Sequence, residues 1–231
     1  MIRARILILT LCLLVAMCGS AIATTLEIDP SKDASLPHGN AQQAATNYGS
    51  SQYLMLTSEG SDVALIQFNL ASIPTNAIID SAVLQLHAEA TIPGAGFIVN
   101  RNTTAWDEAT VTWNSRPTYS DQDGLVYLQS VSAQYQIDLT NWVGNWVAGF
   151  YSNQGITLTT QYHDPVQETP DPLQEHGPYT APTIYSREYV DLSLRPQLCI
   201  DYHVVPEPSA FAVLACGMVG ILTRTRKRRS S

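Results

Sequence analysis

Short segments of alternating hydrophobic and polar residues fill the middle of the chain and predict β-strands. In residues 78–90, Ala82, Leu84 and Leu86 fall on one face of a strand that is half buried. Further strands are predicted at residues 52–57, 62–70, 97–99, 126–128, 135–139, 155–160 and 198–203. Because Gly, Pro, Asn and Asp separate many short strands, the pattern indicates an all-β fold, a jelly-roll-like β-sandwich.

One segment has a helical period instead and predicts a short amphipathic helix. Its apolar positions are Trp142, Val143, Trp146, Val147 and Phe150. Thr140 is the predicted N-cap, and residues 153–155 are predicted to end the helix. We expect the two tryptophans to cover an open end of the sandwich rather than to bind sugar.

Residues 1–23 have the three parts of a secretory signal peptide. Two arginines precede an apolar run at residues 6–17, and small residues then lead to a predicted cleavage site after Ala23. The run is shorter than the roughly 20 residues that a membrane span needs. The alternatives are an N-terminal membrane anchor and a lipoprotein modified at Cys18.

The other end of the chain contains Pro206, Glu207 and Pro208, an apolar run at residues 210–222, and a basic terminus at residues 224–229. This order resembles the PEP-CTERM sorting signal of Gram-negative bacteria. The resemblance implies recognition by an exosortase-type processing enzyme, removal of the tail and release to the cell surface or extracellular matrix. The apolar run would rise only about 20 Å as a helix, against a hydrocarbon core of about 30 Å. It therefore suits a transient anchor in the inner membrane, although a permanent single-span anchor is the alternative.

These ends divide the chain into a signal peptide (1–23), one domain (24–204) and a sorting signal (205–231). The domain holds five basic and nineteen acidic residues, a formal charge of −14, and one cysteine, so it has no internal disulfide. Such a charge disfavours nucleic acid and anionic membranes as partners, and it favours cations such as Ca²⁺.

Several motifs of the domain occur in a recognisable order. They are Asp33-Ala34-Ser35-Leu36, Asn47-Tyr48-Gly49, Gln67-Phe68-Asn69-Leu70, Trp106-Asp107-Glu108-Ala109-Thr110-Val111-Thr112-Trp113-Asn114, Ser186-Arg187-Glu188 and Arg195-Pro196-Gln197-Leu198. This order resembles the DNRLRE (disaggregatase-related) domain, a β-sandwich that is also grouped with carbohydrate-binding modules. The resemblance covers about residues 26–203 and implies binding of extracellular polysaccharide.

The residues themselves indicate that these motifs stabilise the fold first. Asn47 and Gly49 are typical of turns that need positive φ. Trp106 and Trp113 offer large apolar area. Arg187, if buried, needs a carboxylate partner, for which Glu108 and Glu188 are candidates.

Two kinds of binding site are nevertheless predicted. Aromatic rings stack on sugars, and Tyr162, Tyr179, Tyr185 and Arg187 are the candidates for contact with carbohydrate. Oxygen ligands near the N-terminal strand suggest a calcium site made of Asp29, Asp33 and Asn47.

No nucleophile elbow, zinc motif or phosphate-binding loop is present in the sequence, so no catalytic residue is assigned. The predicted function is that of a non-catalytic, exported protein that binds polysaccharide. A structural matrix or adhesion protein without glycan affinity is the alternative. A small polysaccharide-degrading enzyme, using residues in or near the long segment 161–182, is the third.

Overall fold

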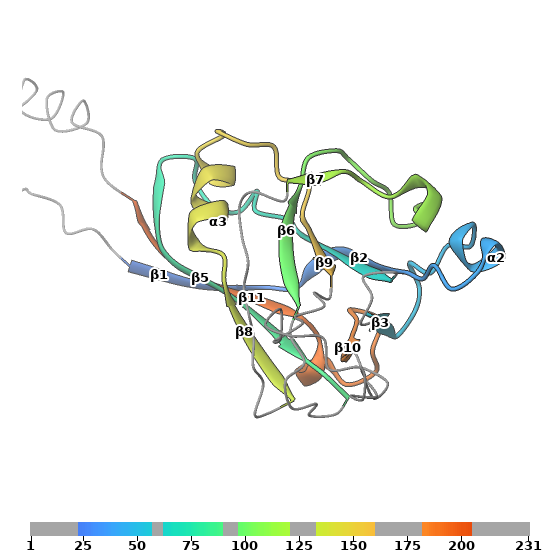
Figure 1. The fold of residues 1–231 in the computed structure, drawn as a ribbon. Coiled ribbons are helices and arrows are strands. Elements are labelled where there is room, and N and C mark those ends of the chain that lie inside the picture. Colours follow the sequence, from blue (N-terminus) through green and yellow to red (C-terminus); the bar gives the residue numbers. More distant parts are fainter. Residues whose placement is uncertain (1–22, 57–61, 90–96, 121–132, 160–181, 205–231) are drawn as a thin grey trace, which may run out of the picture.

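A computed structural model describes residues 23–56, 62–89, 97–120, 133–159 and 182–204. Its strands form a four-stranded sheet, a five-stranded sheet and a two-stranded sheet (Figure 1). The first has the order β1 (Ala23–Ile28), β11 (Gln197–Val204), β5 (Ala77–His87), β8 (Gln134–Asp138). The second has the order β2 (Pro30–Leu36), β4 (Val63–Phe68), β9 (Ile156–Thr159), β6 (Ile98–Asn102), β7 (Tyr119–Ser120), and the third pairs β10 (Thr183–Tyr185) with β3 (Tyr53–Met55).

The all-β sandwich predicted from the alternating pattern is confirmed. All strand pairs between the described residues are antiparallel, and both large sheets mix strands from the two halves of the chain. The predicted strand at residues 126–128 lies outside the described residues. The short elements α2 (Ala41–Ala44), η1 (Trp113–Ser115) and η2 (Leu192–Leu194) lie in connections.

The main core lies between the two large sheets and follows the predicted period of two. Ala82, Leu84 and Leu86 of β5 have no exposed surface, whereas the residues between them are half buried. Ile66 of β4 and Leu158 of β9 belong to the same core cluster, from the opposite sheet. The alternation therefore places one side chain in two on the inner face of each sheet.

The predicted helix is α3 (Thr140–Val147), and its boundaries correct two expectations. Thr140 is the first helical residue rather than the cap, and its hydroxyl accepts a hydrogen bond from the Ala82 amide. The helix ends before Gly149, whose φ of 77° suits a left-handed C-terminal position, and not at residues 153–155. Phe150 lies beyond that end and is 76% exposed, so it is not part of the buried face.

The other four predicted apolar residues of the helix are buried. They are Trp142, Val143, Trp146 and Val147. Both tryptophans join the main core cluster, which confirms the expectation that they cover the sandwich.

The two-stranded sheet joins the large sheets at one end of the sandwich. Its inward residues, Leu54 and Ile184, are fully buried in the main core. An isolated bridge connects Ala88, just after β5, to Ile184, and the Met55 amide donates a hydrogen bond to the Ser35 hydroxyl of β2. These contacts fix β3 and β10 against both layers.

The two ends of the described domain lie side by side, because Ala23 of β1 pairs with His203 of β11. In Figure 1 they lie at the opposite end of the molecule from β3 and β10. The predicted sorting motif and most of the signal peptide fall outside the described residues. Among the described residues, no helix is sufficiently long and apolar to span a membrane.

Candidate functional site

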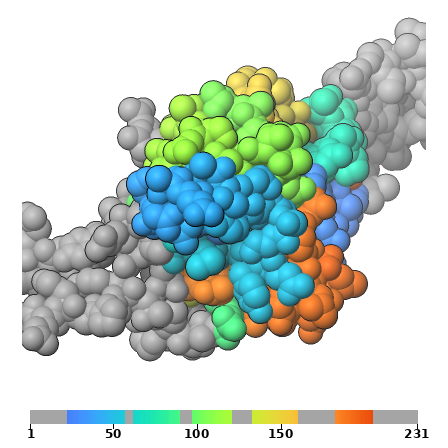
Figure 2. Space-filling view, turned by 90° about the vertical axis from the view of Figure 1, so that its right-hand side faces the viewer, coloured from blue at the N-terminus to red at the C-terminus, as the bar shows by residue number. Residues whose placement is uncertain are grey.

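Three segments that are distant in sequence meet beside the edge strand β2. Figure 2 shows residues 37–56, 103–118 and 182–195 forming one continuous face. The Asn47 amide nitrogen lies 2.8 Å from the Glu108 carbonyl oxygen, and the Ser186 hydroxyl lies 2.6 Å from the Ser51 carbonyl oxygen. The side chains of this face therefore come from segments that are joined to one another by hydrogen bonds.

The tryptophan-containing motif 106–114 forms a second, smaller core on the outer face of the five-stranded sheet. This cluster consists of Ala34, Leu36, Val63, Leu65, Trp106 and Val111, with Trp113 packed against it. The Trp106 indole nitrogen donates a hydrogen bond of 2.9 Å to the Gln154 carbonyl oxygen. Lys32 lies 4.2 Å from the centre of the Trp106 ring. The motif thus has the structural role that its residue types indicated.

The Asn47-Tyr48-Gly49 turn holds this motif in place, but for a different reason from the one predicted. The Asn47 amide nitrogen donates to the carbonyl oxygens of Glu108 and Val111, at 2.8 and 2.7 Å. Gly49 does not have a positive φ. A Cβ at position 49 would lie 2.2 Å from the Glu108 carbonyl oxygen, so glycine is required there by close approach of two backbones.

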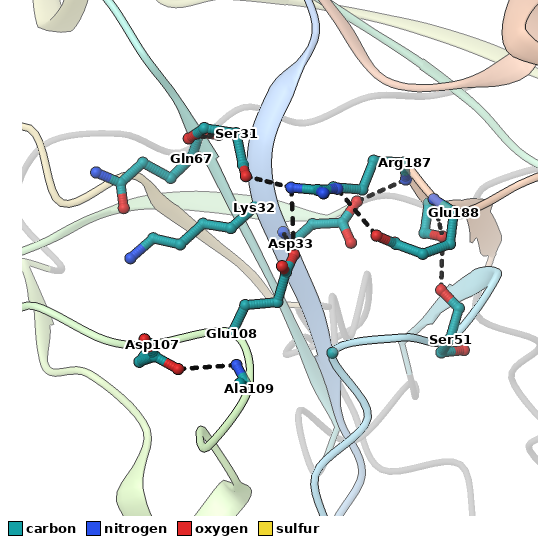
Figure 3. Close-up of polar contacts among 12 residues, drawn as sticks. Ser31, Lys32, Asp33, Ser51, Gln67, Asp107, Glu108, Ala109, Arg187 and Glu188 are labelled. Carbon is teal, nitrogen blue, oxygen red and sulfur yellow. Dashed lines mark hydrogen bonds and ion pairs between the residues drawn. The ribbon is translucent and has the colours of Figure 1, made fainter.

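Three carboxylates and one guanidinium converge on the other side of β2 (Figure 3). Oxygens of Asp33, Glu108 and Glu188 all lie within 4.8 Å of one another. The Arg187 Nε lies 2.9 Å from Glu188 Oε1, and its Nη1 lies 3.6 Å from Glu108 Oε1. Arg187 Nη1 also donates to the Ser31 carbonyl oxygen. The expectation that Glu108 or Glu188 would pair with Arg187 is confirmed for both.

Asp33 is the buried member of this carboxylate cluster, with 1% of its surface exposed. Its Oδ2 accepts a hydrogen bond of 2.8 Å from the Arg187 amide, and its own amide donates to Glu108 Oε1 at 2.8 Å. Burial raises the pKa of Asp33 to about 8. The Arg187 amide opposes this rise. The charge of Glu188, a side-chain hydrogen bond from protonated Asp33 to Glu188, and the charge of Glu108 add to it.

Of the three residues predicted to bind calcium, only Asp33 lies in this cluster. Asp29 is exposed between β1 and β2. Asn47 uses its amide nitrogen on Glu108 and Val111, and its Oδ1 accepts from the Gly49 amide at 3.3 Å. The structure therefore brings Asp33 together with Glu108 and Glu188. The sequence had suggested these two glutamates only as ion-pair partners of Arg187.

A cluster of three half-buried tyrosines, Tyr53, Tyr185 and Tyr189, lies on the outer face of the two-stranded sheet. Tyr53 and Tyr185 are direct partners in the β3–β10 register, with ring centres 5.9 Å apart. The Tyr189 ring centre lies 4.1 Å from that of Tyr185 and 5.7 Å from that of Tyr53. Met55, 50% exposed, extends the same face of β3. The three rings form one aromatic cluster, and each ring carries a hydroxyl group.

The tyrosine hydroxyls are suited to donate hydrogen bonds near neutral pH. Burial raises the pKa of Tyr53 and Tyr185 above its ordinary value, and the nearby Tyr189 and Glu89 add to the rise. These hydroxyls therefore stay protonated, and each can donate one hydrogen bond and accept another.

The four residues predicted to contact carbohydrate are thus divided. Tyr185 lies in the tyrosine cluster, and Arg187, two residues later, lies in the carboxylate cluster with most of its contacts internal. Tyr162 and Tyr179 lie outside the described residues. Tyr53 and Tyr189 were missed, because only the pairing of β3 with β10 brings these rings together.

A second aromatic surface lies on the opposite side of β2 but is already covered by protein. The rings of His38 and Trp113 stack with centres 4.4 Å apart. The Arg116 guanidinium carbon lies 4.0 Å from the centre of the same indole ring. The Trp113 ring is therefore already in contact with two other side chains, those of His38 and Arg116.

An open pocket of about 520 Å³ lies beside α3, lined by residues that include Lys32, Gln67, Asn69 and Trp146. Gln67 Oε1 and the Trp146 indole nitrogen are buried there, and neither has a hydrogen-bond partner in the part of the chain that the structure describes. Trp146 itself is only 8% exposed, so its ring is unsuited to stacking against a sugar. The pocket offers polar contacts but no exposed aromatic surface.

Comparison with known families gives one match. The model of carbohydrate-binding module family 96 matches residues 24–166, more than half of the chain. The match includes Asp33, Tyr53 and Glu108 and ends before Tyr185 and Arg187. No curated protein matches the chain.

Proposed function

Because the chain belongs to carbohydrate-binding module family 96, we propose that its sandwich binds an extracellular polysaccharide through the tyrosine cluster. The observation that carries this proposal is the grouping of three half-buried rings, 4.1 to 5.9 Å apart, on an outer face. Membership of a binding-module family also indicates a non-catalytic role, in agreement with the absence of catalytic motifs in the sequence.

The chemistry of the cluster suits a sugar. A pyranose ring has an apolar face of C–H groups and a rim of hydroxyls. Tyrosine rings offer apolar area at low conformational cost, and their hydroxyls supply hydrogen bonds at the rim. Tyr53 and Tyr185 are fixed by the β3–β10 register, so the platform loses little conformational entropy on binding.

Arg187 has a positioning role in this proposal. Its side chain pairs with Glu108 and Glu188, and its amide donates to Asp33. These contacts fix the chain between Tyr185 and Tyr189, and with it the spacing of two rings.

The charge of the domain favours a neutral polysaccharide. A formal charge of −14 repels an anionic polymer, most strongly at low ionic strength. Glu89, next to the tyrosines, adds to this repulsion at the site itself. We therefore expect neutral polysaccharides to bind more tightly than acidic ones in the absence of divalent cations.

The test is a titration of the purified protein against neutral and acidic polysaccharides, with the release of reducing or unsaturated ends assayed in the same samples. Saturable binding without product supports the proposal. New chain ends would show a degrading enzyme instead, and absence of binding to any glycan would leave a structural matrix or adhesion protein.

Two alanine variants locate the site. Tyr189→Ala removes one ring of the cluster and is expected to weaken binding about tenfold, or about 1.4 kcal/mol. Tyr119→Ala removes an exposed tyrosine from β7, in the five-stranded sheet, and is expected to leave the affinity unchanged. If Tyr189→Ala binds like the wild type, the tyrosine assignment is wrong and the pocket beside α3 becomes the position to test.

We also propose that the protein is exported and sorted to the cell surface or matrix by an exosortase-type enzyme. The support lies in the sequence of residues 1–23 and in Pro206, Glu207, Pro208 and the apolar and basic residues that follow. Mass spectrometry of the protein from its native host tests this directly. The expected mature chain begins at Thr24 and lacks the basic terminus, whereas intact ends would contradict the proposal.

A further inference from the structure

The carboxylate cluster has an electrostatic requirement that the protein's own cations do not meet. When Asp33 is ionised, two oxygens of the cluster, Asp33 Oδ1 and Glu188 Oε2, are buried and have no hydrogen-bond donor among the residues that the structure describes. Asp33 as a whole is 99% buried. A buried carboxylate oxygen without a donor or a cation is costly. An additional positive group, either a proton shared by the two carboxylates or a cation, is therefore expected between these oxygens.

The cations close to the cluster leave it negatively charged. Arg187 contributes one positive charge against the three carboxylates of Asp33, Glu108 and Glu188. Lys32 donates to the Trp106 carbonyl oxygen and lies over the Trp106 ring, and in Figure 3 its ammonium group points away from Asp33. When all three carboxylates are ionised, the cluster has a net charge of −2, which a single divalent cation balances.

We propose that Asp33, Glu108 and Glu188 bind one Ca²⁺ ion. All three offer only oxygen ligands, which hard cations prefer, and no histidine or cysteine of the described residues belongs to the cluster. The side chains of Glu108 and Glu188 are 27% and 23% exposed, so water can complete the coordination shell. Ca²⁺ accepts such an irregular set of six to eight oxygens, whereas Mg²⁺ requires nearly ideal octahedral geometry.

This site replaces the calcium site expected from the sequence. Asp33 is retained, while Glu108 and Glu188 take the places of Asp29 and Asn47. The three ligands come from β2, the loop after β6 and the loop after β10, so one ion would join three segments that are distant in sequence. Glu188 directly precedes Tyr189, so the ion would also restrain the tyrosine cluster; only this last step rests on the proposed function.

Thermal unfolding of the purified protein tests the site without any glycan. The protein is first stripped with EDTA and then titrated with CaCl₂, with MgCl₂ as the comparison. A ligand that binds only the folded state at about 100 times its Kd raises Tm by about 5 °C for a chain of this size. We expect that rise with Ca²⁺ and a smaller one with Mg²⁺. Unchanged Tm with Ca²⁺ would overturn the proposal.

Matched variants assign the ligands. Asp33→Asn keeps the shape of the side chain, and its amide can donate to Glu188 Oε2 while its oxygen still accepts from the Arg187 amide. We therefore expect this variant to be at least as stable as the wild type in EDTA but to lose the response to Ca²⁺. Glu188→Gln is expected to lose the Ca²⁺ response as well. If one of the two variants folds poorly, the other still tests the site.

Asp29→Asn is the matched control, because Asp29 is an exposed aspartate four residues before Asp33. It is expected to keep the full Ca²⁺ response. A full response in Asp33→Asn, or a lost response in Asp29→Asn, would place the ion elsewhere and contradict the assignment. Because these measurements contain no glycan, their failure is distinguishable from failure of the proposed function.

Discussion

The side chains on the two faces of the edge strand β2 lie in opposite kinds of environment. On one side, Ala34 and Leu36 are covered by the tryptophan motif in a small, closed apolar core. On the other side, Asp33 faces Glu108, Glu188 and Arg187 in a charged cluster. Neighbouring residues of one strand thus face an apolar and a highly polar environment, because successive side chains point to opposite sides.

The comparison separates a face that stabilises the fold from the face for which we propose ligand binding. The tryptophan side is satisfied by protein contacts alone, and the ring of Trp113 is occupied by His38 and Arg116. The carboxylate side keeps buried oxygens that have no partner among the described residues, and the half-buried tyrosine cluster lies next to it. Unsatisfied polar atoms and available rings thus mark the second side as the one that is suited to bind ligands.

The largest expected effect is the pH dependence of the carboxylate side. The pKa of Asp33 is raised from 3.8 to about 8 in the folded protein, so folding favours its protonated form. Its contribution to stability is fully present below pH 4 and is lost as the pH rises through 8. In EDTA, we expect the wild type to lose on the order of 4 kcal/mol relative to Asp33→Asn between pH 4 and pH 8.

Urea unfolding of both proteins across this pH range measures the difference directly. Using the variant as the reference removes the contributions of the other titrating groups. Parallel stability curves for the two proteins would show that Asp33 titrates as an ordinary carboxyl, and the contrast between the two sides of β2 would weaken.

A somewhat smaller effect on stability is expected at Gly49, whose backbone lies close to the Glu108 carbonyl oxygen of the tryptophan motif. In Gly49→Ala the new Cβ would lie 2.2 Å from the Glu108 carbonyl oxygen, so the backbone of the tryptophan motif must shift. We expect a loss of about 3 kcal/mol in the free energy of unfolding, with the Ca²⁺ response reduced as well.

Gly144→Ala is the control for this glycine. Gly144 lies within α3, and a Cβ there meets nothing within 4 Å. Alanine at this position is expected to stabilise the protein by about 0.5–1 kcal/mol, because it favours the helix. Similar stability for the two alanine variants would show that the close approach at Gly49 is unimportant.

The strands and the helix of this fold could be predicted from the sequence more reliably than the contacts between its loops. The alternation in residues 78–90 gave β5, and the helical spacing of Trp142 and Trp146 gave α3, because each pattern is local. Both the tyrosine cluster and the carboxylate cluster depend on β10 and the loop that follows it. A three-residue strand such as β10 has too few positions to show a period.

The same limit explains the errors in the predicted site. Asp29 and Asn47 were grouped with Asp33 because they are close in the sequence, yet Glu108 and Glu188 lie closer in space. Gly49 was interpreted through its dihedral freedom, whereas the reason for glycine is its contact with Glu108, 59 positions later. Sequence reasoning identified the relevant residue types, but tertiary contacts decided which of them meet.

A moderate effect on stability alone is expected from the tryptophan side. Trp113→Ala removes a half-buried ring that packs against the small core and contacts His38 and Arg116. We expect a loss of about 2 kcal/mol, because Trp113 is only partly buried and full burial would give a larger value. Polysaccharide affinity, measured by titration calorimetry at a temperature where the variant is folded, is expected to be unchanged. A weakened affinity would mean that ligand binding involves both sides of β2.

The smallest effect separates the two contributions of the tyrosine cluster. Tyr185→Phe keeps the ring and its packing against Tyr53 and Tyr189 but removes one hydroxyl. A single neutral hydrogen bond is worth about 1 kcal/mol or less, so we expect about threefold weaker polysaccharide binding and nearly unchanged Tm. Tyr185→Ala, which also removes the ring, is expected to weaken binding at least tenfold. Equal losses in the two variants would show that the hydroxyl carries the affinity, and the cluster would then bind through polar contacts rather than as a stacking surface.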